Sequence, residues 1–270
     1  LQFRKSVNRE YIDQIPYSAT FSSMEPDAEI RPYEALDKPI IFFHGGLFSA
    51  NLMFCKLYCQ LIKENPTATN LPYYTDLEVK SERSDLMAVD LCAVYFYNYY
   101  FSSISKVCPA YDLKTPFEKN ILYLFLNSIN FFIYSHEVGH WILKHPHEEG
   151  DDRKDEEKWK DEFAADRFAM IHIRNYCGIS NENILTLIGP IVFFRYRILL
   201  ERFKPEIGLK KTHPATIERI EKYKEFLRKN IHVNDRILLE NFLNMEEKIF
   251  SILSNSFDKI HKVALEKFPR

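Results

Sequence analysis

From Thr115 onward, apolar residues recur at three- and four-residue steps, which is the spacing of amphipathic helices. The stretch TPFEKNILYLF opens this region with a Thr that can cap a helix, a Pro at the first helical position and a Glu just after it. We expect this helix to continue, or to restart, through the segment IYSHEVGHWILKH and to end before Pro146.

Further helices are predicted in the remainder of the chain. The charged stretch HEEGDDRKDEEKWKDE is expected to be a solvated loop that leads into a helix from about Glu157 to Cys177. Another helix is expected from Asn181 to Phe203, followed by the loop KPEIGLKKTHPAT. The segments PATIERIEKYKEFLRKN and DRILLENFLNMEEKIFSILSNSFDKIHKVALEKF have the pattern of amphipathic helices.

Residues 1–114 have a less regular pattern. The first forty residues are interrupted by Pro and charged residues, and we expect them to be irregular, with at most a short helix. The segment KPIIFFHGGLFSANLMFCKLYCQLIKE begins as a short apolar strand and becomes a helix from about Ser49. The aromatic-rich stretch LPYYTDLEVKSERSDLMAVDLCAVYFYNYYFSSI fits either a strand or a buried helix. The predicted fold is therefore α+β and mainly helical, with an α+β region at 1–114 and a helical core at 115–270.

Composition and charge narrow the class of function. Lys plus Arg number 36 and Asp plus Glu number 38, so the chain lacks the basic surplus of a nucleic-acid-binding protein. No run of about eighteen apolar residues predicts a membrane span, and no signal peptide opens the chain. The five cysteines follow no zinc-ribbon or redox spacing, which favours buried thiols in a reducing compartment over a disulfide framework. We therefore expect a cytoplasmic protein.

The segment HEVGH carries the strongest chemical signal. A helix places residues i and i+4 on one face, so His136 and His140 can direct their imidazoles at a single metal ion. Glu137 lies beside them, where a carboxylate can hold and deprotonate a water molecule, as in the HExxH zinc hydrolases. The alternative is a pair of surface histidines. The flanking residues are strongly apolar, however, and burying these polar groups without a partner would be costly.

A catalytic zinc site usually needs a third protein ligand. The metzincin pattern requires Gly and His at positions that Leu143 and Pro146 occupy here, which excludes that class. His145 lies one residue too early for that pattern and would face elsewhere on the helix, so we do not favour it as a ligand.

The segment DEFAAD supplies the better candidate. Glu162 follows His140 after a span long enough for a loop and a returning helix, although a solvated acidic residue is the plainer alternative. Asp166 lies one turn beyond Glu162 on the same face and can accept a hydrogen bond from the outer nitrogen of a ligating histidine. The small residues Ala164 and Ala165 would let two helices approach closely around the metal.

The segment THPATIERI adds two further candidates. His213 precedes Pro214 at the head of a predicted helix, where it could stabilise an oxyanion during attack of water on an amide. A capping role in the loop is the alternative for this residue. Arg219 could orient His213 or Asp166, and a surface ion pair is equally compatible with the sequence.

HEVGH, DEFAAD and THPATIERI, in this order, resemble the gluzincin metallopeptidases of the HtpX and CAAX-prenyl-protease type and the soluble minigluzincins. The resemblance covers roughly residues 115–225. It implies a zincin-like core with an active-site helix and a glutamate helix. It also implies zinc ligands His136, His140 and Glu162, the general base Glu137, a supporting carboxylate at Asp166 and a substrate-facing His213.

The HtpX-type enzymes are embedded in membranes, whereas no membrane span is predicted here. Soluble Lit-type phage-exclusion peptidases also resemble this chain in size and in the HExxH motif. These resemblances imply a soluble zinc endopeptidase with a protein or peptide substrate, of a regulated or of a phage-defence or toxin type. Residues 1–114 would then form the substrate cleft or hold a regulatory segment, and a regulatory partner is a further expectation. A catalytically silent zinc scaffold is the alternative function.

Overall fold

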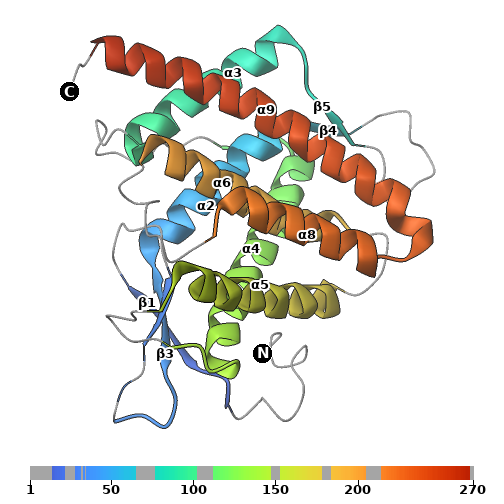
Figure 1. The fold of residues 1–270 in the computed structure, drawn as a ribbon. Helices are drawn as coiled ribbons and strands as arrows, with labels where there is room; N and C mark the ends of the chain where they lie inside the picture. The colour runs from blue at the N-terminus through green and yellow to red at the C-terminus, as the bar shows by residue number, and fades with distance from the viewer. Residues whose placement is uncertain are drawn as a thin grey trace.

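The computed structural model describes residues 14–21, 28–31, 33, 35–64, 77–101, 112–146, 153–177, 184–204 and 214–267 (Figure 1). Most of these residues are helical and two small sheets accompany the helices, which confirms the prediction of a mainly helical α+β fold. Within the described part of the chain, no helix is both long and apolar enough to cross a membrane.

The larger sheet has three strands in the order β1-β3-β2. The central strand β3 (Ile40–His44) pairs in parallel with β1 (Tyr17–Phe21) and antiparallel with β2 (Ala28–Arg31). The prediction that the first forty residues are irregular is therefore wrong for β1 and β2. These strands are short and have little pattern of their own, so only their pairing with β3 makes them strands. The second sheet pairs β4 (Ile62–Glu64) with β5 (Leu77–Val79).

The central element of the fold is α4 (Pro116–Ile142), a single helix of 27 residues. Its N-terminus has the predicted capping box: the amide of Glu118 donates to Thr115 Oγ1 at 3.1 Å, and Glu118 Oε2 accepts from the amide of Thr115 at 3.2 Å. Lys80 Nζ lies 2.9 Å from the other carboxylate oxygen of Glu118 and so ties the cap to the second sheet. The sequence therefore predicted the start of α4, and of the two alternatives that it left open, continuation or restart before HEVGH, the structure shows continuation.

Several elements surround α4. It contacts α2 (Gly45–Gln60), α5 (Asp155–Cys177) and α6 (Gly189–Phe203), as well as strands β2 and β3. Figure 1 shows α4 running through the middle of the molecule, with α5 crossing it near its C-terminal end and α8 lying between α5 and α9. The HEVGH segment is thus the part of α4 that α5 covers.

The other helical elements agree with the predicted pattern except at some boundaries. The helix predicted from Ser49 begins at Gly45, because burial of Leu47 and other side chains in this first turn offsets the poor helix propensity of Gly45 and Gly46. Of the ambiguous stretch at 71–104, the structure describes residues 77–101: Leu77–Val79 form β5, and the aromatic-rich residues 83–101 are helical. The remaining helical elements are α3 (Arg83–Phe96), the π-helix η2 (Tyr97–Phe101), the short 3₁₀ helices η4 (Leu185–Ile188) and η5 (Val233–Asp235), α8 (Thr216–Asn230) and α9 (Arg236–Lys267).

One hydrophobic core joins the helices on both sides of α4. Phe96 of α3 contacts Phe54 of α2, Tyr196 of α6 and Phe257 of α9, with ring centroids 5.8, 6.2 and 5.7 Å apart. All four rings are almost completely buried. Buried aromatic rings contribute large apolar areas and preferred edge contacts, so this cluster holds α2, α3, α6 and α9 together.

The C-terminal end of α4 has a specific geometry. The amide of Lys144 donates to the carbonyl of Trp141 at 3.1 Å, and the amide of His145 donates to the carbonyl of His140 at 3.0 Å. These two bonds form a Schellman motif, which places Lys144 in the left-handed region with φ of 57°. Glycine is the usual residue at this position, because a Cβ is strained there. The chain therefore turns sharply at Lys144, and Pro146 follows.

Replacing Lys144 with glycine is expected to stabilise the protein by about 1 kcal/mol, because glycine adopts this backbone conformation without steric strain. For a domain of this size, the gain corresponds to roughly 2–4 °C in Tm. Lys144→Ala is the matched control, since it removes the long side chain but keeps the Cβ. Thermal unfolding of the three proteins, followed by circular dichroism, measures the difference, and a glycine variant no more stable than the alanine variant would contradict the argument.

Candidate metal centre

The candidate centre lies where α4 and α5 approach one another most closely. A Cβ added at Gly139 would stand 3.2 Å from Ala165 Cα and 3.2 Å from the side chain of Phe168. Such distances are tighter than ordinary carbon contacts, so a larger residue at Gly139 would push the two helices apart. The small residues at positions 139 and 165 thus set the distance between the HEVGH segment and the DEFAAD segment.

At this crossing, α4 and α5 bring three donor side chains together. His136 Nε2 lies 3.1 Å from His140 Nε2 and 3.5 Å from Glu162 Oε2, and His140 Nε2 lies 3.4 Å from Glu162 Oε1. His136 and Glu162 are buried, and each residue directs one donor atom into the same small volume. This group can hold a metal ion.

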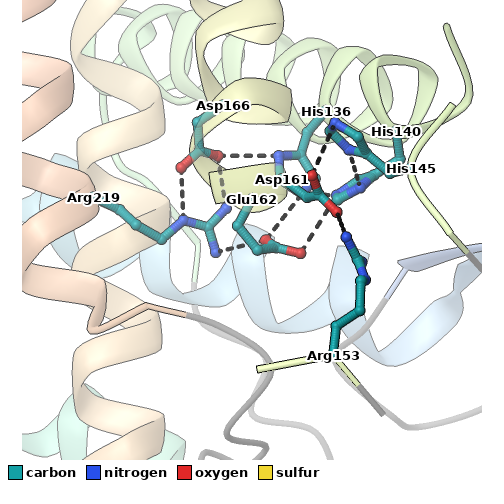
Figure 2. Close-up of polar contacts among 8 residues, drawn as sticks. All are labelled: His136, His140, His145, Arg153, Asp161, Glu162, Asp166 and Arg219. Atoms are coloured by element: carbon teal, nitrogen blue, oxygen red, sulfur yellow. Dashed lines mark hydrogen bonds and ion pairs between the residues drawn. The ribbon is translucent and has the colours of Figure 1, made fainter. Parts of the chain in front are cut away.

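His136 is held from behind by a buried carboxylate. Its Nδ1 lies 3.0 Å from Asp166 Oδ1, and its Nε2 is directed at His140 and Glu162 (Figure 2). Arg219 of α8 binds the same carboxylate with two hydrogen bonds, from Nε to Oδ2 at 2.8 Å and from Nη2 to Oδ1 at 2.7 Å. The Arg219 guanidinium also lies over the ring of Phe194, 4.9 Å from its centroid. Of the options left open by the sequence, the structure therefore places Arg219 on Asp166, in a buried position.

The carboxylates determine the electrostatics of this site. Burial alone would lower the pKa of His136, but hydrogen bonds to Asp166 and Glu162, and the charges of both, raise it to about 10. Burial also disfavours the charged form of Asp166, yet the charge of Arg219 and the hydrogen bonds from Arg219 and His136 lower the pKa of that carboxyl. The site is therefore built to hold positive charge between its carboxylates.

His140 has a different set of partners on its outer side. Its Nδ1 lies 2.9 Å from Nδ1 of His145, whose Nε2 lies 3.6 Å from Asp161 Oδ1. Arg153 Nη1 in turn binds Asp161 Oδ2 at 2.7 Å. Burial lowers the pKa of His145, and the negative charge of Asp161, which acts to raise this pKa, offsets only part of the effect. The expectation that His145 faces elsewhere is wrong, because α4 ends at Ile142 and the left-handed turn redirects the chain.

The other predicted catalytic residues differ in what the structure shows of them. Glu137 follows His136 on α4 and is half-buried. Its charge lies near enough to Arg219 to contribute to the raised pKa of that guanidinium, where burial opposes the rise and Asp166 and Glu162 are the larger causes. His213 lies outside the described residues, which resume at Pro214 just before α8. Its assignment therefore still rests on the sequence.

Comparison with known protein families identifies one similarity. Residues 109–238 match the family described as Peptidase U49, a family of Lit-type peptidases. The matched segment contains all of α4, α5, α6 and α8, and therefore all three donor residues. No curated protein and no solved structure matches the chain. The match supports a peptidase, and hence a hydrolase that acts on protein substrates.

Asp166→Ala is expected to weaken metal binding at the candidate centre by about 10- to 100-fold, because His136 loses the carboxylate that orients it. The same change removes both hydrogen bonds between Arg219 and Asp166 and leaves the buried guanidinium with the longer contact to Glu162, at 3.7 Å, which costs about 3–5 kcal/mol of stability. Competition with a chromophoric chelator measures the affinity, at a temperature where circular dichroism shows the variant to be folded.

The double variant Asp166→Ala/Arg219→Met separates these two effects. It removes the buried guanidinium that has lost its closer carboxylate and should recover part of the stability. It should not recover the metal affinity, since His136 still lacks Asp166. Recovery of both properties would show that Asp166 acts only through folding.

Proposed function

We propose that this protein is a zinc-dependent endopeptidase whose zinc ligands are His136, His140 and Glu162. One observation carries the proposal: His136 Nε2 and His140 Nε2 lie 3.1 Å apart, and each lies close to one carboxylate oxygen of Glu162, His136 at 3.5 Å from Oε2 and His140 at 3.4 Å from Oε1. Tetrahedral zinc with bonds of 2.0–2.2 Å requires its ligand atoms to be about 3.3–3.5 Å apart. The side chains therefore have nearly the spacing that the ion demands.

The chemistry of the donors also favours zinc. Two imidazole nitrogens and one carboxylate oxygen form the ligand set of several zinc peptidases, and three protein ligands leave the fourth position for water or substrate. A purely structural site usually takes four protein ligands. This donor set, together with the similarity of residues 109–238 to a peptidase family, supports a catalytic role.

When bound, zinc would supply a Lewis acid that lowers the pKa of a water molecule to about 7 and polarises the scissile carbonyl. Glu137 is proposed as the general base. It lies next to His136 in the chain and is partly exposed, so its carboxylate can take a proton from the attacking water and deliver it to the leaving amine. A side chain in this role must remain accessible, in contrast to the buried Asp166.

Asp166 and Arg219 are proposed to act through His136. The carboxylate of Asp166, 3.0 Å from His136 Nδ1, favours the tautomer in which Nδ1 has the proton and Nε2 has a lone pair for the metal. Arg219 fixes both oxygens of Asp166 and so prevents rotation of the carboxylate. His213 is proposed, from the sequence alone, to stabilise the oxyanion.

The substrate is proposed to be a protein, and the enzyme a regulated protease of the kind that the Lit-type resemblance implies. A cytoplasmic location is also proposed. Cys55 and Cys59 are buried and Cys92 is partly buried, and none of these three forms a disulfide, as expected for thiols in a reducing compartment.

The protein should bind one zinc ion per chain. We expect metal analysis after dialysis against zinc to give a stoichiometry near one, and we expect the His136→Ala/His140→Ala double variant to lose it, because two of the three ligands are gone. His232→Leu/His261→Leu is the control for nonspecific binding to histidines elsewhere in the chain. Stoichiometric, tightly bound zinc in the His136/His140 double variant would refute the assigned ligands.

Glu137→Gln should retain zinc and fold but lose proteolysis by about 100- to 10,000-fold, because an amide cannot accept the proton of the attacking water. Labelling of newly formed peptide N-termini in a proteome treated with either protein measures the difference. Glu157→Gln, an exposed position in the first turn of α5, is the matched control. Equal cleavage by wild type and Glu137→Gln would refute the mechanism. Absence of cleavage by the zinc-loaded wild type would instead favour a catalytically silent zinc scaffold.

A further inference from the structure

The Nδ1 atoms of His136 and His140, which face away from the centre of the candidate metal site, contact different kinds of partner. The Nδ1 atom of His136 lies 3.0 Å from the carboxylate of Asp166. Behind His140 stands a second imidazole, that of His145, at 2.9 Å between the two Nδ1 atoms. Figure 2 shows these two sets of contacts on opposite sides of Glu162. The second set includes a residue that the proposed mechanism does not use.

Each of these two sets of contacts includes an aspartate of α5, and each aspartate binds an arginine. Asp166 is bound by Arg219, and Asp161 is bound by Arg153 at 2.7 Å. Asp161 immediately precedes Glu162 in α5, and Asp166 follows Glu162 by one helical turn. Asp166 reaches its histidine directly, whereas Asp161 approaches only His145, at 3.6 Å. The imidazole of His145 therefore bridges the space between His140 and Asp161.

The backbone conformation at the C-terminal end of α4 places the side chain of His145 between His140 and Asp161. A continuing helix would direct residue 145 away from residue 140, since five positions correspond to 500° of rotation, about 140° from the starting face. Instead, the left-handed conformation of Lys144 turns the chain back, and the amide of His145 bonds to the carbonyl of His140 at 3.0 Å. A non-glycine residue in this conformation is strained, and such strain tends to occur at functional sites.

The chemistry of a ligating histidine requires a partner in this position. If Nε2 of His140 binds the metal, its Nδ1 has the proton and must donate a hydrogen bond. Nδ1 of His145 can accept it, and the proton of His145 then lies on Nε2, which faces Asp161. The side chain of His145 is only 9% exposed, so water has little access to replace it.

We propose that His145 is a positioning residue for the metal centre: it accepts a hydrogen bond from His140 Nδ1 and so holds the Nε2 of His140 in place for zinc. Asp161 and Arg153 anchor His145 in the required orientation. This inference rests on the proposed zinc site and adds to it a support for the second histidine. His145 itself does not bind the metal.

The test is the zinc affinity of variants at position 145, measured by competition with a chromophoric chelator. His145→Leu should weaken binding by about 10- to 100-fold, the usual effect of losing such a partner. His145→Asn should recover most of the affinity, since its Oδ1 can accept where Nδ1 did. The exposed His232 provides the matched control, and His232→Leu should bind zinc as the wild type does.

Cobalt provides a second readout that does not depend on activity. The visible absorption of the Co²⁺-loaded protein reports the geometry of the ligands. His145→Leu should change the spectrum, and His145→Asn should restore it. Circular dichroism of the metal-free variants checks that they are folded.

Two outcomes would overturn the inference. The first is wild-type zinc affinity in His145→Leu, and the second is equal loss of affinity in the folded Leu and Asn variants, since the hydrogen bond could then not be the cause. If His145→Leu does not fold, the pair His145→Asn and His145→Gln carries the test, because Gln extends its amide toward the position of Nε2. The Asn variant should then bind zinc more tightly, and equal affinities would overturn the inference. Failure of the proposed function is distinguishable, because the wild-type protein itself would then lack tight zinc binding.

Discussion

The close contact between α4 and α5 at Gly139 determines the distance between the two halves of the candidate metal centre. His136 and His140 lie on α4, and Glu162 and Asp166 lie on α5, so every contact between these histidines and these carboxylates crosses from one helix to the other. A Cβ at Gly139 would stand 3.2 Å from the backbone of Ala165. Donor atoms 3.1–3.5 Å apart cannot tolerate the helix displacement that a bulkier residue would cause.

The buried charges at the candidate metal centre are balanced differently from those of a buried ion pair elsewhere in the fold. The buried pair between Arg195 and Glu246 is satisfied one to one, with hydrogen bonds of 2.9 and 3.0 Å, and Tyr58 donates a further bond to the carboxylate. At the metal centre, by contrast, Glu162 and Asp166 face a single buried guanidinium. The excess of negative charge raises the pKa of His136, and a bound cation would balance it. The first arrangement has the character of a structural pair, and the second has the character of a binding site.

The packing around α4 explains why the site can be rigid. Phe132, one turn before His136, contacts Phe194 and Tyr223 edge to face, with ring centroids 5.4 and 5.9 Å apart. Phe194 also lies under the guanidinium of Arg219. The same aromatic ring therefore supports both the helix that presents His136 and the arginine that fixes Asp166. Side chains supported in this way would need little rearrangement to bind an ion.

The sequence by itself determined those features that depend on local periodicity. The capping box at Thr115, the helical state of HEVGH and the shared face of His136 and His140 all follow from interactions between residues three or four positions apart. The order of HEVGH and DEFAAD also indicated Glu162 as the third donor, and the structure brings these three side chains together.

Only the tertiary structure decided the features that depend on residues distant in the chain. β1 and β2 exist through pairing with β3, and α2 begins at Gly45 because its first turn is buried. The choice of Asp166 as the partner of Arg219 required the placement of α8 against α5. His145 reaches His140 because Lys144 adopts a left-handed conformation, which helical periodicity does not predict for a lysine. In each case the deciding energy comes from pairing, packing or buried charge between segments, which a pattern of neighbouring residues does not record.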